Sequence, residues 1–229
     1  MAEERKLAVV DLGRCDYDTA WDVQTAVHAT ILEDEGEPDR LILVEHPAVI
    51  TLGRGADPQN VLFNEDYLSS QGVELRRTDR GGDVTYHGPG QIVAYPIVRL
   101  MGRRRDVHGY FRSLEQVVIE LLAEYRIRAG REDGLTGVWV GDEKVCAMGV
   151  AIKRWITYHG LALNVAPNLG HFRLITPCGI ADKGVTSMRE LLGRSVPMAE
   201  VKEKLVRQFA AEFEYQQVER EQIPDGAET

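Results

Sequence analysis

The chain has 229 residues, of which 44% are apolar and 28% are charged, a composition typical of one globular domain with a full buried core. Its net charge of −9 argues against nonspecific binding of nucleic acid, because neutralising phosphates needs a positive surface. No apolar run approaches the roughly 18 residues that span a bilayer, and the N-terminus has no apolar signal segment, so we expect a soluble, cytoplasmic protein without a membrane partner.

The first part of the chain is predicted to alternate strands with helices. Residues 7–13 and 41–45 are short apolar runs typical of strands. Between them, Asp16 can cap a helix whose apolar residues recur at helical spacing. We expect further elements over residues 48–52 (strand), 64–70 (helix) and 73–78 (strand).

A glycine-rich stretch follows at residues 80–91, RGGDVTYHGPGQ. Glycine permits positive φ angles and a close approach to the main chain, and Pro89 stiffens the turn around it. Residues 92–98 then read as a buried strand. We therefore expect a rigid loop that runs into the core, where binding residues often lie. A second loop of this kind, at residues 53–55 (GRG), could lie beside residues 80–82.

The second half is predicted to contain two long helices and two hairpins. Apolar residues recur at helical spacing from about 106 to 125 and from about 198 to 213. Residues 137–140 and 144–152 flank a glycine turn, and a second hairpin turns at residues 154–155 and returns through 157–165. Residues 166–180 are expected to be irregular, and an acidic tail from about residue 214 is expected to be frayed.

Adjacent hairpins interrupted by long helices predict an α/β (α+β) fold, in which helices pack on mixed β-sheets and residues 1–229 form a single domain. The sequence has no GxxxxGK[ST] loop and no GxGxxG motif between a strand and a helix. It therefore does not support a nucleotide fold that cradles phosphates, and we expect no cofactor.

Three cysteines at irregular spacing, without a CxxC motif, favour free thiols over disulfides or a zinc site, so we expect no metal. Cys178 lies between Pro177 and Gly179, where its sulfur would be accessible for reaction. Cys146 lies in an apolar strand and is expected in the core, whereas Cys15 lies in a polar turn.

A reactive thiol needs a neighbour that helps it to ionise, because its unperturbed pKa is about 8.5. His87 and His159, each followed by glycine, and Lys144, at the start of a predicted strand, are the candidates. A histidine bonded to local backbone would explain His87 and His159 equally well, and from its own surroundings Lys144 reads first as a turn lysine in solvent. The pattern of residues leaves the choice open.

Four separated motifs resemble the octanoyltransferases of lipoic acid synthesis, also called lipoyl(octanoyl) transferases. The motifs are RGG at 80–82 with TYHGPGQ at 85–91 and YP at 95–96, KVCAMG at 144–149, HGLALN at 159–164, and PCGI at 177–180. The match runs in order from about residue 40 to about residue 192. Cys146 occupies a position that is usually small in the family, a mild departure.

The resemblance implies the fold shared by the catalytic domains of lipoate and biotin protein ligases. It also implies an acyltransferase that moves octanoyl from octanoyl-acyl carrier protein to a lysine of a lipoyl domain. The implied acceptors are the lipoyl domains of 2-oxoacid dehydrogenases and the glycine cleavage H protein. By position, Cys178 would carry the acyl group as a thioester, and Lys144 would lower the pKa of this thiol and move protons. The residues implied to bind the acyl group are Arg80, Gly81, Gly82, Asp83, Val84, Thr85, Tyr86, His87, Ala147, Met148, Gly149, His159, Gly160, Leu161 and Ala162.

Three rival functions fit parts of this pattern. They are an ATP-dependent lipoate-protein ligase, a cysteine-dependent acyl thioesterase with His87 or His159 as its base, and a catalytically silent binder of lipoyl domains or carrier proteins. Octanoyl transfer is favoured because an acyl thioester is already activated and needs no ATP, in line with the missing phosphate loop.

Arginines gather in clusters within this acidic chain, among them Arg103-Arg104-Arg105. Solvated loops and helix ends would explain these clusters. Alternatively, they attract acidic carrier proteins, and we then expect reversal of the three charges to weaken carrier binding, most at low salt.

Overall fold

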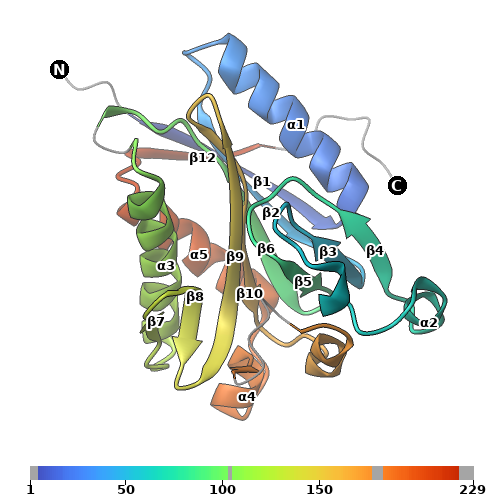
Figure 1. Ribbon diagram of the computed structural model, residues 1–229. Helices are drawn as coiled ribbons and strands as arrows, with labels where there is room; N and C mark the ends of the chain where they lie inside the picture. The colour runs from blue at the N-terminus through green and yellow to red at the C-terminus, as the bar shows by residue number, and fades with distance from the viewer. Residues whose placement is uncertain (1–4, 103–104, 177–182, 222–229) are drawn as a thin grey trace.

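The computed structural model describes residues 5–102, 105–176 and 183–221. Two β-sheets and the helices packed on them make up this part of the chain (Figure 1). The predicted mixed α/β fold is confirmed. None of the helices in these residues is long and apolar enough to cross a membrane.

The larger sheet joins nine strands of the described residues in the order β12-β1-β2-β6-β10-β9-β8-β7, with β11 paired to β9. Strand β1 runs parallel to β2 and β12, whereas the neighbours from β2 to β7 run antiparallel. The strands are β1 (Lys6–Arg14), β2 (Asp39–Glu45), β6 (Gln91–Ile97), β7 (Gly130–Glu132), β8 (Leu135–Val140), β9 (Glu143–Lys153), β10 (Ile156–Asn164), β11 (Gly184–Val185) and β12 (Gln217–Glu221).

Helices cover both faces of this sheet. Helix α1 (Tyr17–Glu33) packs on one face, and α3 (Val107–Glu124) and α5 (Met198–Glu212) pack on the other (Figure 1). Side chains alternate between the faces along each strand. In β2, Leu41 and Leu43 therefore join the core under α3 and α5, while Ile42 and Val44 join the core under α1.

Short signals in the sequence start the helices. The Asp16 carboxylate accepts a hydrogen bond from the Thr19 amide (2.8 Å) and caps α1 as predicted. Asp106 caps α3 in the same way through the amide of His108 (3.0 Å). Two shorter helices are α2 (Glu65–Ser70) and α4 (Met188–Leu192).

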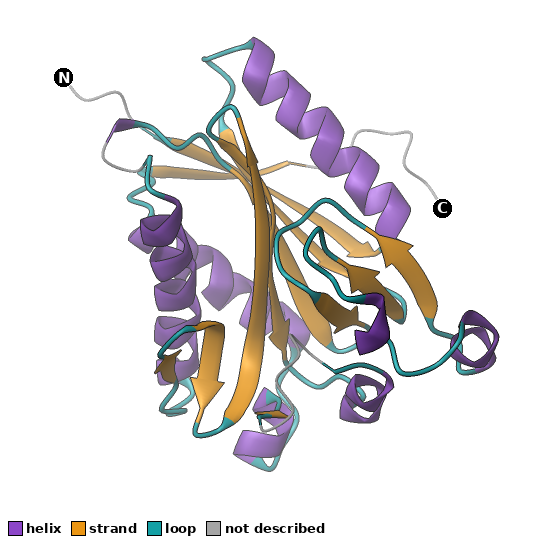
Figure 2. Cartoon of the chain, in the orientation of Figure 1, coloured by secondary structure: helices purple, strands orange, loops and turns teal. Residues whose placement is uncertain are grey.

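A smaller sheet of three strands lies near the N-terminal end of α1 (Figure 2). Its order is β4 (Glu74–Arg77), β3 (Val49–Leu52) and β5 (Val84–His87). The Arg76–Asp18 ion pair (3.0 Å) ties this sheet to α1, and the Tyr17 hydroxyl bonds Thr78 (3.0 Å) next to β4. The expectation of an unbroken loop over residues 80–91 is therefore wrong at 84–87, where pairing with β3 makes a strand.

The two glycine-rich loops do lie side by side, as the sequence suggested. The Arg54 amide donates to the Arg80 carbonyl (3.0 Å), and the Gly55 amide donates to the Gly82 carbonyl (3.2 Å). A Cβ atom at Gly53 would overlap the Gly82 carbonyl oxygen, so this close contact requires glycine.

Both predicted hairpins are confirmed. Strands β8 and β9 pair around the turn at residues 141–142, and β9 and β10 pair around Arg154 and Trp155. These two turn residues have φ angles of 53° and 64°, as in the two-residue turns that match the twist of a hairpin.

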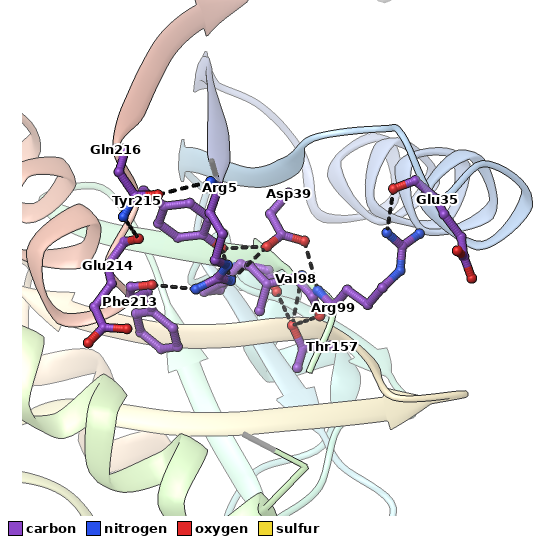
Figure 3. A network of polar contacts seen from close by, with 11 residues as sticks. Arg5, Glu35, Asp39, Val98, Arg99, Thr157, Phe213, Glu214, Tyr215 and Gln216 are labelled. Atoms are coloured by element: carbon purple, nitrogen blue, oxygen red, sulfur yellow. Dashed lines mark hydrogen bonds and ion pairs between the residues drawn. The ribbon is translucent and has the colours of Figure 1, made fainter. Parts of the chain in front are cut away.

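The two ends of the described chain meet at Asp39 (Figure 3). Its carboxylate accepts hydrogen bonds from the Arg5 guanidinium (3.0 Å), the Tyr215 hydroxyl (2.7 Å) and the Arg99 amide (2.8 Å). The chain then continues into β12, which pairs with β1. The expectation of a frayed tail from residue 214 is therefore wrong as far as Glu221.

The segment expected to be irregular, 166–180, contains a 3₁₀ helix at Leu169–Leu174, and residues 177–180 lie outside the described part of the chain. The short strands β7 and β11 and the helix α4 were not predicted, although Ser187 and Gly193 cap the two ends of α4.

Candidate active site

A pocket lies between the two sheets. It holds about 500 Å³ of empty space when the part open to solvent is included. Helix α1, the loop before β5, and strands β5, β6, β9 and β10 all contribute to its lining. The lining residues are Tyr17, Arg80, Gly82, Asp83, Val84, Thr85, His87, Val93, Tyr95, Ala147, Met148, Gly149, His159, Gly160, Leu161 and Ala162.

The structure brings together all the residues implied to bind the acyl group except Gly81 and Tyr86. Gly81 instead donates its amide hydrogen to the Val150 carbonyl (2.9 Å), which holds the loop against β9. Tyr86 is fully buried behind the pocket, where its hydroxyl bonds His171 Nδ1 (2.8 Å) and its ring packs on Phe172.

Small residues on two neighbouring strands make room for the pocket. Gly149 of β9 pairs directly with Gly160 of β10, and Ala147 pairs with Ala162. A Cβ at Gly149 would lie 2.9 Å from the Gly81 carbonyl oxygen, so only glycine lets the loop approach this closely. A Cβ at Gly160 would overlap the main chain of β6.

Arg80 is a buried charge that fastens the loop to the smaller sheet. It is only 7% exposed, and its guanidinium donates to the carbonyl (2.7 Å) and hydroxyl (2.9 Å) oxygens of Thr51 in β3. Buried cations require such partners. These hydrogen bonds make Arg80 an anchor of the pocket wall.

Two buried histidines, His87 in the pocket lining and His46 behind it, are neutral groups. His46 Nδ1 donates to the Cys15 carbonyl (2.8 Å), and its Nε2 therefore accepts from the Tyr95 hydroxyl (2.7 Å). His87 Nδ1 bonds the Gln91 side-chain oxygen (2.8 Å). Burial lowers the pKa of His46 to about 4 and that of His87 to about 3. A base with so low a pKa is weak at neutral pH, which counts against His87 as the base of a thioesterase.

His159 lies at the edge of the same layer, in β10. Its Nε2 is 2.8 Å from the Asp79 carboxylate, which also accepts from the Tyr158 hydroxyl (2.6 Å). Burial lowers the pKa of His159, although Asp79 opposes this shift. Burial alone would raise the pKa of Asp79, but the hydrogen bonds from His159 and Tyr158 leave it lowered.

Lys144 lies near the start of β9, three residues before Ala147, or about 10 Å along the strand. It is outside the lining that the described residues give the pocket. Strand β8 places Trp139 opposite it, and β11 places Val185 on its other side. The Lys144 ammonium nitrogen lies 4.7 Å from the centre of the Trp139 ring.

Cys178 lies outside the described residues, so its role as nucleophile and its pairing with Lys144 stay predictions. The described chain on either side is held firmly. The Thr176 amide donates to the Asn60 carbonyl (2.8 Å), and the Thr186 amide donates to the Lys144 carbonyl (3.0 Å). Where the described chain resumes, Val185 of β11 pairs with Lys144. Cys146 is fully buried in β9, and burial raises the pKa of its thiol, as expected for a core cysteine.

Three of the lining residues, Tyr17, Val93 and Tyr95, were not among those implied to bind the acyl group, although Tyr95 belongs to one of the motifs. Val93 and Tyr95 lie on the face of β6 that points toward α1, and period-2 alternation within the predicted strand would have placed them together. Tyr17 is far away in the sequence, and only the packing of α1 on the sheet brings it to the pocket.

Sequence comparison places the chain in a family of known proteins. The model of the lipoyl protein ligase A/B catalytic domain family matches residues 16–210. The chain belongs to this family. Curated members similar to it are the octanoyltransferase of Alkaliphilus metalliredigens, 49% identical over 214 residues, and that of Solibacter usitatus, 47% identical over 212 residues. These alignments cover 93% of the chain and, in turn, 98% and 95% of the two relatives.

The family fold is also evident in solved structures. A putative lipoate protein ligase from T. acidophilum with bound lipoic acid superposes with a TM-score of 0.78, covering 98% of this chain and 92% of that one. The sequences are only 16% identical, so this similarity concerns the fold. The predicted relation to the catalytic domains of lipoate ligases is thereby confirmed.

Proposed function

We propose that this member of the lipoyl protein ligase A/B family is an octanoyltransferase. The observation that carries the proposal is the pocket between the two sheets, because its lining contains nearly all of the residues at which the sequence resembles the octanoyltransferases. Relatives named octanoyltransferase, which share nearly half of their residues with the chain over almost their whole length, support it.

The pocket is suited to an aliphatic chain. Glycine and alanine on β9 and β10 leave a space that Leu161, Met148 and Val93 line with apolar atoms. Burying methylene groups there would stabilise the bound acyl chain by about 0.8 kcal/mol each. The polar atoms of the neighbouring rings bond other protein groups: Tyr95 bonds His46, His87 bonds Gln91, and Tyr17 bonds Thr78. The rings can therefore act as walls.

In the proposed reaction, the Cys178 thiolate attacks the carbonyl carbon of octanoyl-acyl carrier protein. The bond from this carbon to the carrier sulfur breaks, and the carrier thiol leaves with a proton from the Lys144 ammonium. Backbone amides of the glycine loops would stabilise the oxyanion of the tetrahedral intermediate. The octanoyl group then remains on Cys178 as a thioester.

The second half of the reaction returns the enzyme to its starting state. The neutral amine of a lysine on a lipoyl domain attacks the octanoyl thioester, the bond to the Cys178 sulfur breaks, and Lys144 takes up the proton that the amine releases. Acyl transfer between thioester and amine needs no ATP. The donor is proposed to be octanoyl-acyl carrier protein, and the acceptors the lipoyl domains of 2-oxoacid dehydrogenases and the glycine cleavage H protein.

Intact-mass spectrometry tests this mechanism. After incubation with octanoyl-acyl carrier protein, the enzyme should gain the mass of one octanoyl group, and Cys178→Ala should stay unmodified. We expect Lys144→Met to acylate at least 100-fold more slowly, because general acid-base help typically contributes 10²- to 10⁴-fold. An unmodified wild-type protein, or an adduct that persists in Cys178→Ala, would exclude the assignment.

A turnover assay with an apo lipoyl domain separates the rival functions. Octanoyl transfer without ATP supports the proposal, whereas transfer that consumes ATP supports a ligase. Free octanoate released in the absence of acceptor supports a thioesterase, and tight binding without turnover supports a silent binder.

A further inference from the structure

Trp139 of β8 is an unusual buried tryptophan. Its side chain is 4% exposed, and its indole nitrogen has no hydrogen-bond partner among the described residues. Buried indole N–H groups usually find one. A buried donor without a partner is unfavourable. We therefore looked for an interaction of the aromatic face that a smaller apolar residue could not make.

The Lys144 ammonium lies over the face of the Trp139 ring. Trp139 and Lys144 are directly paired across β8 and β9, which places their side chains on the same side of the sheet. The distance of 4.7 Å from Nζ to the ring centre is well within the range of about 6 Å for cation–π attraction.

Gly137 lies directly beside the lysine side chain. A Cβ at this position would be 3.4 Å from both Cδ and Cε of Lys144 and 2.6 Å from the Cys146 carbonyl oxygen. Its φ of 120° is also a conformation that favours glycine. The stem of Lys144 therefore runs past Gly137 to the ring of Trp139.

A buried carboxylate fixes the main chain at this point. Glu115 of α3 is 2% exposed, and it accepts a hydrogen bond from the Gly137 amide (3.2 Å). Arg112 and Arg131 each lie 2.9 Å from this carboxylate and balance its charge. The strand under the lysine is thus tied to the helix behind it.

We propose that Trp139 is a positioning residue that holds the Lys144 ammonium in place for the reaction of Cys178. This inference rests on the proposed function, in which that ammonium stabilises the Cys178 thiolate. A lysine side chain is flexible, and attraction to the ring favours both one location and the charged form. Lys183 also lies near the ring, at 5.9 Å, but its charge is paired with Glu132 (2.8 Å) and Asp142 (2.5 Å).

The test measures how the reactivity of Cys178 depends on pH. Iodoacetamide alkylation is followed from pH 5 to 10 by mass spectrometry of the peptide that contains Cys178, in wild type, Trp139→Phe and Trp139→Leu. Without the aromatic face, Trp139→Leu should react about three- to tenfold more slowly at pH 7, with its midpoint shifted upward by about half to one pH unit. Trp139→Phe keeps a ring and loses no indole hydrogen bond, so its shift should be less than half as large.

Two controls distinguish positioning from loss of packing. Trp155→Leu removes an exposed tryptophan at the far end of β9, where Arg105 lies 5.6 Å from the ring, and it should leave the profile unchanged. In a Lys144→Met background, Trp139→Leu should cause no further shift, because the ring acts through the lysine. Urea unfolding of each variant shows whether it is folded at the assay temperature.

Each outcome decides a separate question. If Lys144→Met leaves the alkylation profile of Cys178 unchanged, the proposed Cys–Lys pair fails, and the positioning role fails with it. If Lys144→Met shifts the profile but both Trp139 variants match wild type, only the positioning role is overturned. An equal shift from Trp139→Leu with and without Lys144 would assign the tryptophan to packing alone.

Discussion

The residues in and behind the wall of the candidate pocket show how burial sets the charge of a side chain. His46 and His87 are both buried, and each is bonded through nitrogens that suit the neutral ring. Their pKa values are lowered because a protonated ring in the protein interior would lose the stabilising contact of its charge with water. Polar aromatic groups can therefore line a pocket for an apolar chain without bringing charge into it.

This burial predicts a loss of stability in mild acid. Below the unfolded-state pKa of about 6.5, the unfolded chain binds a proton at His46 that the folded protein takes up only near pH 4. The free energy of unfolding should therefore fall by about 1.4 kcal/mol per pH unit from this residue, between pH 6.5 and about 4. In His46→Phe, the decrease between pH 7 and pH 5 should be smaller by about 2 kcal/mol, measured by urea unfolding.

His108, an exposed residue of α3, provides the matched control for this prediction. His108→Phe should keep the pH dependence of the wild type. If His46→Phe keeps it as well, burial of His46 does not govern the acid sensitivity.

At the scale of elements, hairpins were predictable and edge strands were not. The turns at residues 141–142 and 154–155 lie between apolar runs, so local signals defined β8, β9 and β10. Strand β5 is only four residues long and lies between glycine clusters, and it exists because β3 pairs with it. Strand β12, at the sheet edge, ends in three charged residues of alternating sign. Charges at an edge prevent other strands from pairing with it, but in the sequence such a segment resembles a disordered tail.

Some residues of the candidate pocket were likewise predictable from local sequence, and others were not. The glycines and alanines of its walls were found through motifs, whereas Tyr17 reaches it through the packing of α1 on the sheet. The tryptophan opposite Lys144 was part of a predicted strand, but its role depends on the pairing register of β8 and β9. Sequence patterns contain no direct information on such registers when a bulge intervenes, as it does at Val138.

The facing pair Ala147 and Ala162 should set the length of the acyl chain. Ala162→Val adds two carbons to the pocket wall, so we expect the ratio of kcat/KM for octanoyl over hexanoyl carrier protein to fall about tenfold. Ala151→Val makes the same change in β9 outside the pocket lining, and this variant should retain the wild-type ratio. If Ala162→Val lowers kcat/KM equally for both donors, this position does not determine the preferred chain length.

At the scale of the whole molecule, Arg105 of the arginine cluster lies far from Lys144. Arg105 packs on Trp155 at the tip of the β9–β10 hairpin. Lys144 lies nine residues before Lys153 in β9, or about 30 Å away along the strand. Arg103 and Arg104 lie outside the described residues.

The predicted role of the arginine cluster in carrier docking can be tested with Arg105→Glu. If the cluster attracts acidic carriers, KM for octanoyl-acyl carrier protein should rise severalfold at low salt and approach the wild-type value at high salt, because salt screens exposed charges. Lys6→Glu makes the same charge change at an exposed position of β1 and should have little effect. An unchanged KM in Arg105→Glu would place carrier docking elsewhere, nearer to Lys144.

Strand β9 carries both Lys144 and one wall of the pocket. A bulge interrupts the alternation of side chains between Lys144 and Cys146, and consecutive residues Val145 and Cys146 both pack into the core under α3 and α5. In a regular strand, two residues three apart, such as Lys144 and Ala147, would point to opposite faces. The bulge therefore links the orientation of the proposed proton carrier to that of the wall that holds the acyl chain.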